Sequence, residues 1–338
     1  MSRQPRGTEP SYMEYLQRGI DYVRDHPEQA AAAGLAGLLL FGDSDEESDY
    51  NVDFVFWDVE HGDAMFIDSP EANIVVDLGQ HKNGFSPINY LSNNGVERVD
   101  WLIISHPDKD HIRDIAILDD QYDISLYSSP DEAAPYIKHK KEYTYPNDEV
   151  YQTISDKFLE FEGRRLSYQE PPIERGQLRV HEFSLSPDEL GMTPAKQLST
   201  DEKSPSLNNL SILNIFEYNG FKLSTMGDLE EKGIELLLDR ADVRRALQGT
   251  DVLVAPHHGR DSSYAPRLFD YITPEIVAIS DADGTEYSAS QKYSHQATGK
   301  TVEHREGDST VRNVVTTRKD GAIYLGVNSS SDYQVTIE

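Results

Sequence analysis

Short apolar runs alternate with stretches of helical spacing from residue 52 to the end of the chain. This alternation is typical of strands and amphipathic helices. The predicted strands are 52–57, 64–68, 74–78, 99–104, 178–185, 210–218, 221–226, 252–255, 276–280, 314–317 and 322–327. The predicted helices are 87–91, 112–118, 229–238, 241–247 and 265–271. Strand pairs followed by helices occur in both halves of the chain, so we expect an α/β fold in which sheets are covered by helices.

Three segments depart from this regular pattern. Residues 1–50 have helical spacing followed by an acidic linker, and we interpret them as an N-terminal helical appendage to a single domain spanning 51–338. Residues 119–206 are polar and rich in Tyr and Pro, which favours a less regular insertion, and 187–206 are expected to form a mobile loop. A turn at 319–321 is expected to join the last two predicted strands, which would close the chain.

Charge is the strongest compositional signal. The formal net charge is −29, and acidic residues are spread along most of the chain. Such a field repels phosphate backbones at ordinary ionic strength, whereas the Debye length falls to about 3 Å in molar salt. We therefore favour a protein of a halophilic cytoplasm over one that excludes anions as its function. An ordinary soluble acidic protein is the alternative.

The chain contains no cysteine. Disulfides, thiolate zinc sites and thiol nucleophiles are therefore excluded. The longest apolar stretch, 30–42, is too short to span a bilayer as a helix and lies late for a signal peptide. We expect a buried or interfacial helix there, no integral membrane segment, and residence in the cytoplasm.

Metal-ligating side chains cluster directly after the apolar run 99–104. Two histidines and two aspartates occupy His106, Asp108, Asp110 and His111. Imidazole and carboxylate groups bind divalent metals, so this cluster predicts a metal site rather than a solvated polar loop.

Two later strands also end in ligand-type residues. Asp228 follows 221–226 through one glycine, and His257 and His258 follow 252–255 through one proline. Ligand sites of open sheets lie at such strand ends. Asp228 alone could be a helix N-cap, but the three placements together indicate one site.

These segments resemble a known family. The motif 105–111 (Ser-His-Pro-Asp-Lys-Asp-His) closely resembles the metal motif of the metallo-β-lactamase superfamily, in the branch formed by the hydrolase domain of ComEC-like competence proteins. Further matching segments occur in the expected order at 57–64, 74–79, 208–211, 226–230, 256–259, 293–295 and 320–323. The resemblance implies an αββα sandwich with a metal cleft along the sheet edge.

The resemblance also implies two divalent metal ions. His106 and Asp108 would bind one ion, Asp110 and His111 the other, Asp228 would bridge them and His257 would complete a coordination sphere. We favour His257 over His258 as the ligand, with His258 as a supporting donor or a substrate contact. Much of the superfamily has His at position 108 and a further His near Asn208 and Asn209. The site is thus richer in oxygen, which makes Mn²⁺ or Mg²⁺ plausible beside Zn²⁺.

The leading hypothesis is a metal-dependent hydrolase, most plausibly a phosphodiesterase or nuclease acting on nucleic acid. We expect Asp108 or Asp110 to accept the proton from the attacking water. We expect His258 or His295 to donate a proton to the leaving group. Ser262 and Ser263 are candidate phosphate contacts, or caps of the next helix, and His295 is equally a surface residue. The alternatives are a hydrolase of another ester, thioester or lactone, and a non-catalytic partner protein that retains the fold.

Overall fold

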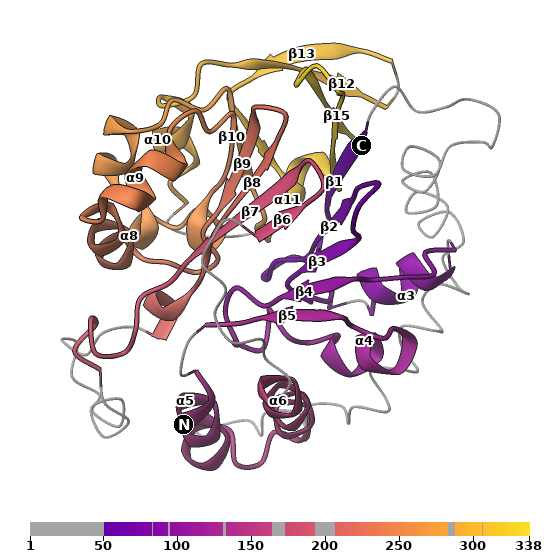
Figure 1. Ribbon diagram of the computed structural model, residues 1–338, viewed down its shortest axis with the longest axis vertical. Helices are drawn as coiled ribbons and strands as arrows, with labels where there is room; N and C mark the ends of the chain where they lie inside the picture. The colour runs from indigo at the N-terminus through magenta and orange to yellow at the C-terminus, as the bar shows by residue number, and fades with distance from the viewer. Residues whose placement is uncertain are drawn as a thin grey trace, which may run out of the picture.

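The structure is a computed structural model that describes residues 51–82, 84–93, 95–130, 133–163, 173–192, 207–282, 288–305 and 307–338. The predicted appendage at 1–50, and most of the predicted loop at 187–206, lie outside these residues. Within the described part, two β-sheets face each other and helices cover their outer faces (Figure 1).

The larger sheet has the strand order β13-β12-β16-β15-β1-β2-β3-β4-β5. Strands β1, β2 and β3 form an antiparallel meander, and β3, β4 and β5 run parallel. The strands are β1 (Val52–Phe56), β2 (Met65–Asp68), β3 (Ile74–Val76), β4 (Trp101–Ile103), β5 (Leu126–Ser128), β12 (Lys300–His304), β13 (Ser309–Arg312), β15 (Ile323–Val327) and β16 (Tyr333–Ile337).

The smaller sheet has the order β14-β11-β10-β9-β8-β7-β6. Strands β6 to β9 are antiparallel neighbours, whereas β9, β10, β11 and β14 are parallel. The strands are β6 (Ile173–Arg175), β7 (Leu178–Phe183), β8 (Leu213–Tyr218), β9 (Phe221–Thr225), β10 (Val252–Val254), β11 (Ile276–Ile279) and β14 (Val314–Thr316).

Helices form the two outer layers. Helices α3, α4 and α6 pack on the larger sheet, and α8, α9 and α10 lie on the far side against the smaller one (Figure 1). The α-helices are α3 (Pro87–Asn93), α4 (Ile115–Gln121), α5 (Ala134–His139), α6 (Glu149–Glu162), α8 (Glu231–Leu238), α9 (Ala241–Leu247), α10 (Ser290–Ser294) and α11 (Thr317–Asp320). The 3₁₀-helices are η2 (Leu207–Leu210), η3 (Pro256–Gly259), η4 (Asp261–Ser263) and η5 (Pro266–Asp270), and η1 (Lys140–Thr144) is a π-helix.

The alternation of side chains along each strand builds the layers. In β1, Phe54 and Phe56 point into the core between the sheets, whereas Val55 faces the helices. On the smaller sheet Phe216 points into the same inner core, and its neighbour Ile215 faces α8 and α9. Both faces of the central strands are therefore apolar, which explains why the sequence shows them as continuous apolar runs. These layers confirm the predicted metallo-β-lactamase-type α/β sandwich.

Two parts of the chain differ from the sequence expectation. The stretch 119–206 is more regular than predicted, because it supplies β5 to the larger sheet, β6 and β7 to the smaller sheet, and the amphipathic helix α6. The last two predicted strands, β14 and β15, lie in different sheets and are joined by α11 rather than by a simple turn, and β16 follows them. Among the described residues, no helix combines the length and apolar character needed to cross a bilayer.

One cross-strand pair in the larger sheet joins two acids. Asp53 of β1 lies opposite Asp68 of β2. Burial, reinforced by the charge of Asp68, raises the pKa of Asp53 from its ordinary value of 3.8 to about 7. Because the folded chain then binds this proton more tightly than the unfolded chain, Asp53 makes stability fall as the pH rises from about 4 to about 7.

We therefore expect Asp53→Asn to stabilise the protein at pH 8 by about 1–3 kcal/mol. The gain should shrink to a few tenths of a kcal/mol near pH 4, where Asp53 is protonated in the folded chain and about half protonated in the unfolded chain. Chemical denaturation at the two pH values measures it, with Asp123→Asn, at an exposed position, as the control. An effect of Asp53→Asn at pH 4 as large as that at pH 8 would contradict this account.

Candidate metal centre

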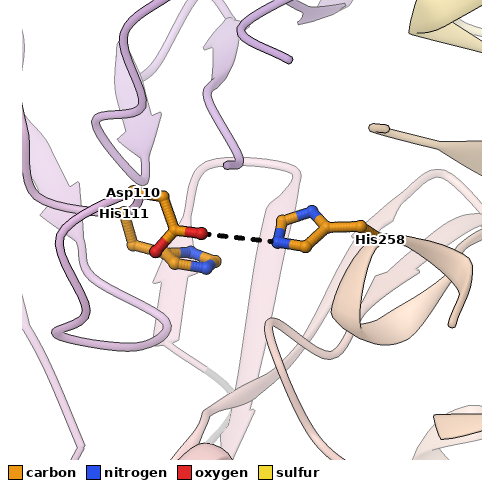
Figure 2. A group of neighbouring side chains, drawn as sticks. All are labelled: Asp110, His111 and His258. Carbon is orange, nitrogen blue, oxygen red and sulfur yellow. Dashed lines mark ion pairs between the residues drawn. The ribbon is translucent and has the colours of Figure 1, made fainter. Parts of the chain in front are cut away.

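The loops that follow β1, β4, β9 and β10 meet at the seam between the two sheets. The loop after β4 carries Asp110 and His111, the residues after β9 carry Asp228, and η3 after β10 carries His258. His258 faces Asp110 and His111 from the opposite side of this seam (Figure 2). Each sheet thus contributes part of one cluster, in which residues that follow different strands lie together.

The polar atoms of this cluster are close together. Asp228 Oδ1 lies 3.2 Å from His111 Nε2 and 3.5 Å from His258 Nε2. His258 Nε2 is also 3.8 Å from Asp110 Oδ2, the pair marked in Figure 2. One ligand atom each from Asp110, His111 and His258 lie within 4.8 Å of one another, which is the spacing needed to hold a metal ion.

Three of these atoms are buried without a hydrogen bond among the described residues. They are Nε2 of His111, Nε2 of His258 and Oδ1 of Asp228. Buried polar atoms are almost always paired, because leaving one unpaired costs the free energy of its lost hydration. A cation between them would satisfy all three atoms at once, so the donor set fits a divalent metal.

Neighbouring groups orient both imidazoles toward the cluster. Nδ1 of His111 lies 3.0 Å from Asp77 Oδ2, and Asp77 in turn accepts hydrogen bonds from the backbone N–H and the hydroxyl of Ser105. Nδ1 of His258 donates to the carbonyl oxygen of Ser280 at 3.1 Å. With Nδ1 of each ring engaged, Nε2 faces the cluster, as is usual for histidines that bind metals.

The electrostatics of the cluster favour a cation. Burial alone would raise the pKa of Asp228, but His111 and His258 outweigh it and hold that pKa well below its usual range. Burial would lower the pKa of His111, but Asp228 and Asp77 raise it above its usual range. Burial raises the pKa of the nearby Asp63 to about 6. Asp228 is therefore an ionised carboxylate inside the protein, where an ion's charge is screened little.

The two adjacent histidines have different surroundings. His257 Nε2 lies 3.1 Å from an Arg260 guanidinium nitrogen and 3.8 Å from Asp228 Oδ2, and the Asn208 amide is 3.5 Å from the ring. Burial, and then the positive charge of Arg260, act against protonation and lower the pKa of His257 to about 4 although Asp228 favours the charged form. Because Arg260 already uses Nε2 of His257, the geometry favours His258 as the ligand and departs from the preference for His257 drawn from the sequence.

The first pair of predicted ligands lies apart from the three-residue groups. His106 Nε2 is 3.3 Å from Asp108 Oδ2, and the ammonium of Lys140 contacts the other carboxylate oxygen of Asp108. Burial would raise the pKa of Asp108, but His106 and Lys140 lower it below its usual range. Among the described residues, no group of three ligand atoms includes His106 or Asp108.

Among the described residues, no hydrogen bond or ion pair joins the predicted substrate residues to the cluster. Ser262 is exposed and Ser263 buried, both in η4, and neither caps a helix through its side chain. His295 is exposed at the end of α10. The geometry therefore gives these three residues no role at the cluster among the described residues.

Three residues at the site were not predicted from the sequence as site residues. Two of them are Asp63, which lies 3.8 Å from His258 Nδ1, and Asp77. Both lie at strand ends in segments that resemble the family, and this placement is a sequence signal that could have identified them. Lys140 lies in the stretch 119–206, where no motif or spacing marks it. A lysine in a polar segment is ordinarily a solvated side chain.

The comparisons with known proteins agree with the predicted family. Residues 57–195 match the model of the metallo-beta-lactamase superfamily. The chain is also 24% identical over 273 residues to ComE operon protein 3 of Bacillus subtilis (strain 168), a match that covers 74% of this chain and 30% of that protein. The chain thus spans less than a third of the length of this relative. These matches confirm the predicted resemblance to the superfamily and to ComEC-like proteins, and they support a hydrolase of this superfamily.

Solved structures include similar proteins at low identity. A diphosphatase of the PhnP family is 7% identical, with a TM-score of 0.40 over 79% of this chain and 95% of that one. A protein of the metallo-beta-lactamase superfamily from Thermotoga maritima is 11% identical, with a TM-score of 0.38 over 78% of this chain and 97% of that one.

Gly62 holds two of the site's loops together. Its φ is +130°, and a Cβ there would lie 2.4 Å from the carbonyl oxygen of Asp110. Its own carbonyl accepts a hydrogen bond of 2.8 Å from Ser280, the residue whose carbonyl orients His258. The loop after β1 therefore approaches the Asp110 backbone as closely as only glycine permits, and it also holds Ser280, whose carbonyl orients His258.

We expect Gly62→Ala to destabilise the fold by about 1–3 kcal/mol, because the added methyl group displaces the Asp110 backbone. Thermal or chemical denaturation measures the loss. Gly220→Ala is the matched control, since its φ of +102° is also left-handed but nothing lies within 4 Å of the added Cβ. Equal losses in the two variants would show that backbone strain alone, and not the close approach to Asp110, sets the cost.

Proposed function

We propose that the chain is a metal-dependent hydrolase that cleaves phosphodiesters, with nucleic acid as its substrate class. The observation that carries the metal is the set of buried, unpartnered atoms of His111, His258 and Asp228. The superfamily match supports hydrolysis. Nucleic acid as the substrate class is what the resemblance of the motifs to ComEC-like competence proteins implies.

We assign Asp110, His111, Asp228 and His258 as the residues that would hold the ion. A divalent ion held by these residues would supply an activated water nucleophile and positive charge to stabilise a phosphate oxygen. The assignment replaces His257 by His258 in the ligand set. It also removes His258 from the role of proton donor, because its Nε2 is turned toward Asp110 and Asp228 and its Nδ1 donates to Ser280.

Asp110, a member of the ligand set, and Asp108, which lies outside it, differ in their capacity to accept a proton. Asp110 is 39% exposed, so it reaches both the cluster and solvent. Asp108 is held in ion pairs with His106 and Lys140, which lower its pKa and make it a poor proton acceptor. Of the two residues expected from the sequence to accept the proton, we therefore retain Asp110.

The acidic composition affects the approach of a polyanionic substrate to the chain, and therefore the salt concentration at which activity should be assayed. With a net charge of −29, long-range repulsion of a polyanion is strong at low salt and largely screened at about 1 M, where the Debye length is about 3 Å. The purified chain should cleave single-stranded DNA and a nitrophenyl phosphodiester in the presence of Mn²⁺, Mg²⁺ or Zn²⁺ in molar salt. Turnover of a nitrophenyl ester, a thioester or a lactone, but of neither diester, would contradict the assignment to phosphodiesters.

We expect Asp110→Asn to remain folded and to lose at least about 100-fold in diester turnover. The amide keeps the shape of the side chain but removes its charge and its basicity. Asp188→Asn, at an exposed turn, is the matched control and should keep its activity. If the wild-type chain binds metal but cleaves no diester, and Asp110→Asn only lowers its melting temperature, the chain is a non-catalytic protein with a structural metal.

We expect Asp77→Asn to weaken metal binding by roughly 10–100-fold, because the carboxylate that orients His111 is lost while His111 itself remains. Isothermal titration with Mn²⁺ or Zn²⁺ measures this change, and Asp188→Asn again serves as the control. Unchanged affinity in Asp77→Asn would contradict the assignment of His111 as a ligand.

A further inference from the structure

Lys140 inserts its ammonium group into the part of the site that the family resemblance assigns to a second metal ion. Its Nζ contacts Asp108 Oδ1, and the other oxygen of Asp108 lies 3.3 Å from His106 Nε2. Lys140 is only 17% exposed and Asp108 28%, so the ion pair is largely shielded from water. Lys140 therefore occupies one oxygen of Asp108, whereas the other oxygen approaches His106 Nε2, which makes no hydrogen bond among the described residues.

The backbone that delivers Lys140 has an unusual conformation. Lys140 is the first residue of the π-helix η1, in which the N–H of Tyr145 bonds to its carbonyl at 2.9 Å. The Gln152 side chain of α6 donates to the carbonyls of Lys141 and Tyr145 at 2.8 and 2.9 Å and fixes this turn. Single π-helical turns are rare and occur frequently at functional sites.

A second contact fastens the same segment to the metal motif. Lys109, next to Asp108, pairs at 2.8 Å with Asp148, the N-cap of α6. The segment formed by η1 and α6 is thus joined to residues 108 and 109 by two ion pairs. The segment formed by η1 and α6 therefore holds Lys140 in position beside Asp108.

The remaining residues near Asp108 do not complete a metal site. His106 supplies one imidazole, but the position of the further histidine is taken by Asn208, whose amide lies 3.5 Å from the His257 ring. Arg260 adds another positive charge, 3.1 Å from His257. Among the described residues, no three ligand atoms that include one of His106 or Asp108 lie within 4.8 Å of one another, and a dication here would meet an ammonium group on the carboxylate that should bind it.

We propose that the ammonium of Lys140 takes the place of the second metal ion, so that the protein binds one divalent ion per chain, at Asp110, His111, Asp228 and His258. Lys140 then provides the fixed positive charge that a second ion would otherwise bring beside an anionic substrate. This inference rests on the proposed metal site but not on the identity of the substrate.

Metal stoichiometry tests the proposal without relying on turnover. The full chain is stripped with chelator, loaded with excess Mn²⁺ or Zn²⁺, freed of unbound ion, and analysed by inductively coupled plasma mass spectrometry. The variants are Lys140→Met, which keeps the length of the side chain, and Lys140→Arg, which keeps its charge. Lys141→Met is the matched control, because Lys141 pairs with Asp156 on α6 instead of with the motif. Circular dichroism establishes that each variant is folded.

We expect one ion per chain in the wild type, in Lys140→Arg and in Lys141→Met, and a second, weaker equivalent only in Lys140→Met. Two ions in the wild type would overturn the inference while leaving the proposed function intact. A stoichiometry of one in folded Lys140→Met would refute the claim that Lys140 excludes the second ion. One ion in the wild type without diester cleavage would contradict the proposed function and leave this inference standing.

Discussion

The site depends on one buried carboxylate shared between two sheets. Asp228, at the end of β9, directs a single oxygen at His111 from the larger sheet's half of the fold and at His258 from the smaller sheet's half. An ionised group buried in this way requires compensation, and the two imidazoles supply only part of it. The packing of the two sheets therefore fixes the distance between these groups, and a cation completes the balance of charge.

Around this carboxylate the two halves of the predicted site differ in kind. On one side the imidazoles are oriented by Asp77 and by the carbonyl of Ser280, and their free nitrogens converge on one point. On the other side Asp108 is neutralised by Lys140. A site with one strong cation position and one built-in positive charge meets the electrostatic needs of an anionic substrate with fewer ions than the family resemblance implies.

The sequence predicted the strands that are buried on both faces. It predicted site residues only where they lie in a recognisable motif. Apolar runs located the central strands, because strands buried on both faces leave no polar positions. Helix α6 was missed within a polar, Tyr- and Pro-rich stretch, and with it the π-helical turn that presents Lys140. No pattern in the sequence distinguishes His257 from His258, because they are adjacent and the contacts that separate them, Arg260 with His257 and the Ser280 carbonyl with His258, arise only in the folded chain.

The position of bound metal tests this account most directly. Crystals of the chain grown with Mn²⁺, and measured at a wavelength where manganese scatters anomalously, would locate each ion. The account predicts one anomalous peak, between Asp110, His111, Asp228 and His258, with the Lys140 ammonium still on Asp108. A peak between His106 and Asp108, or no peak at the first position, would contradict it.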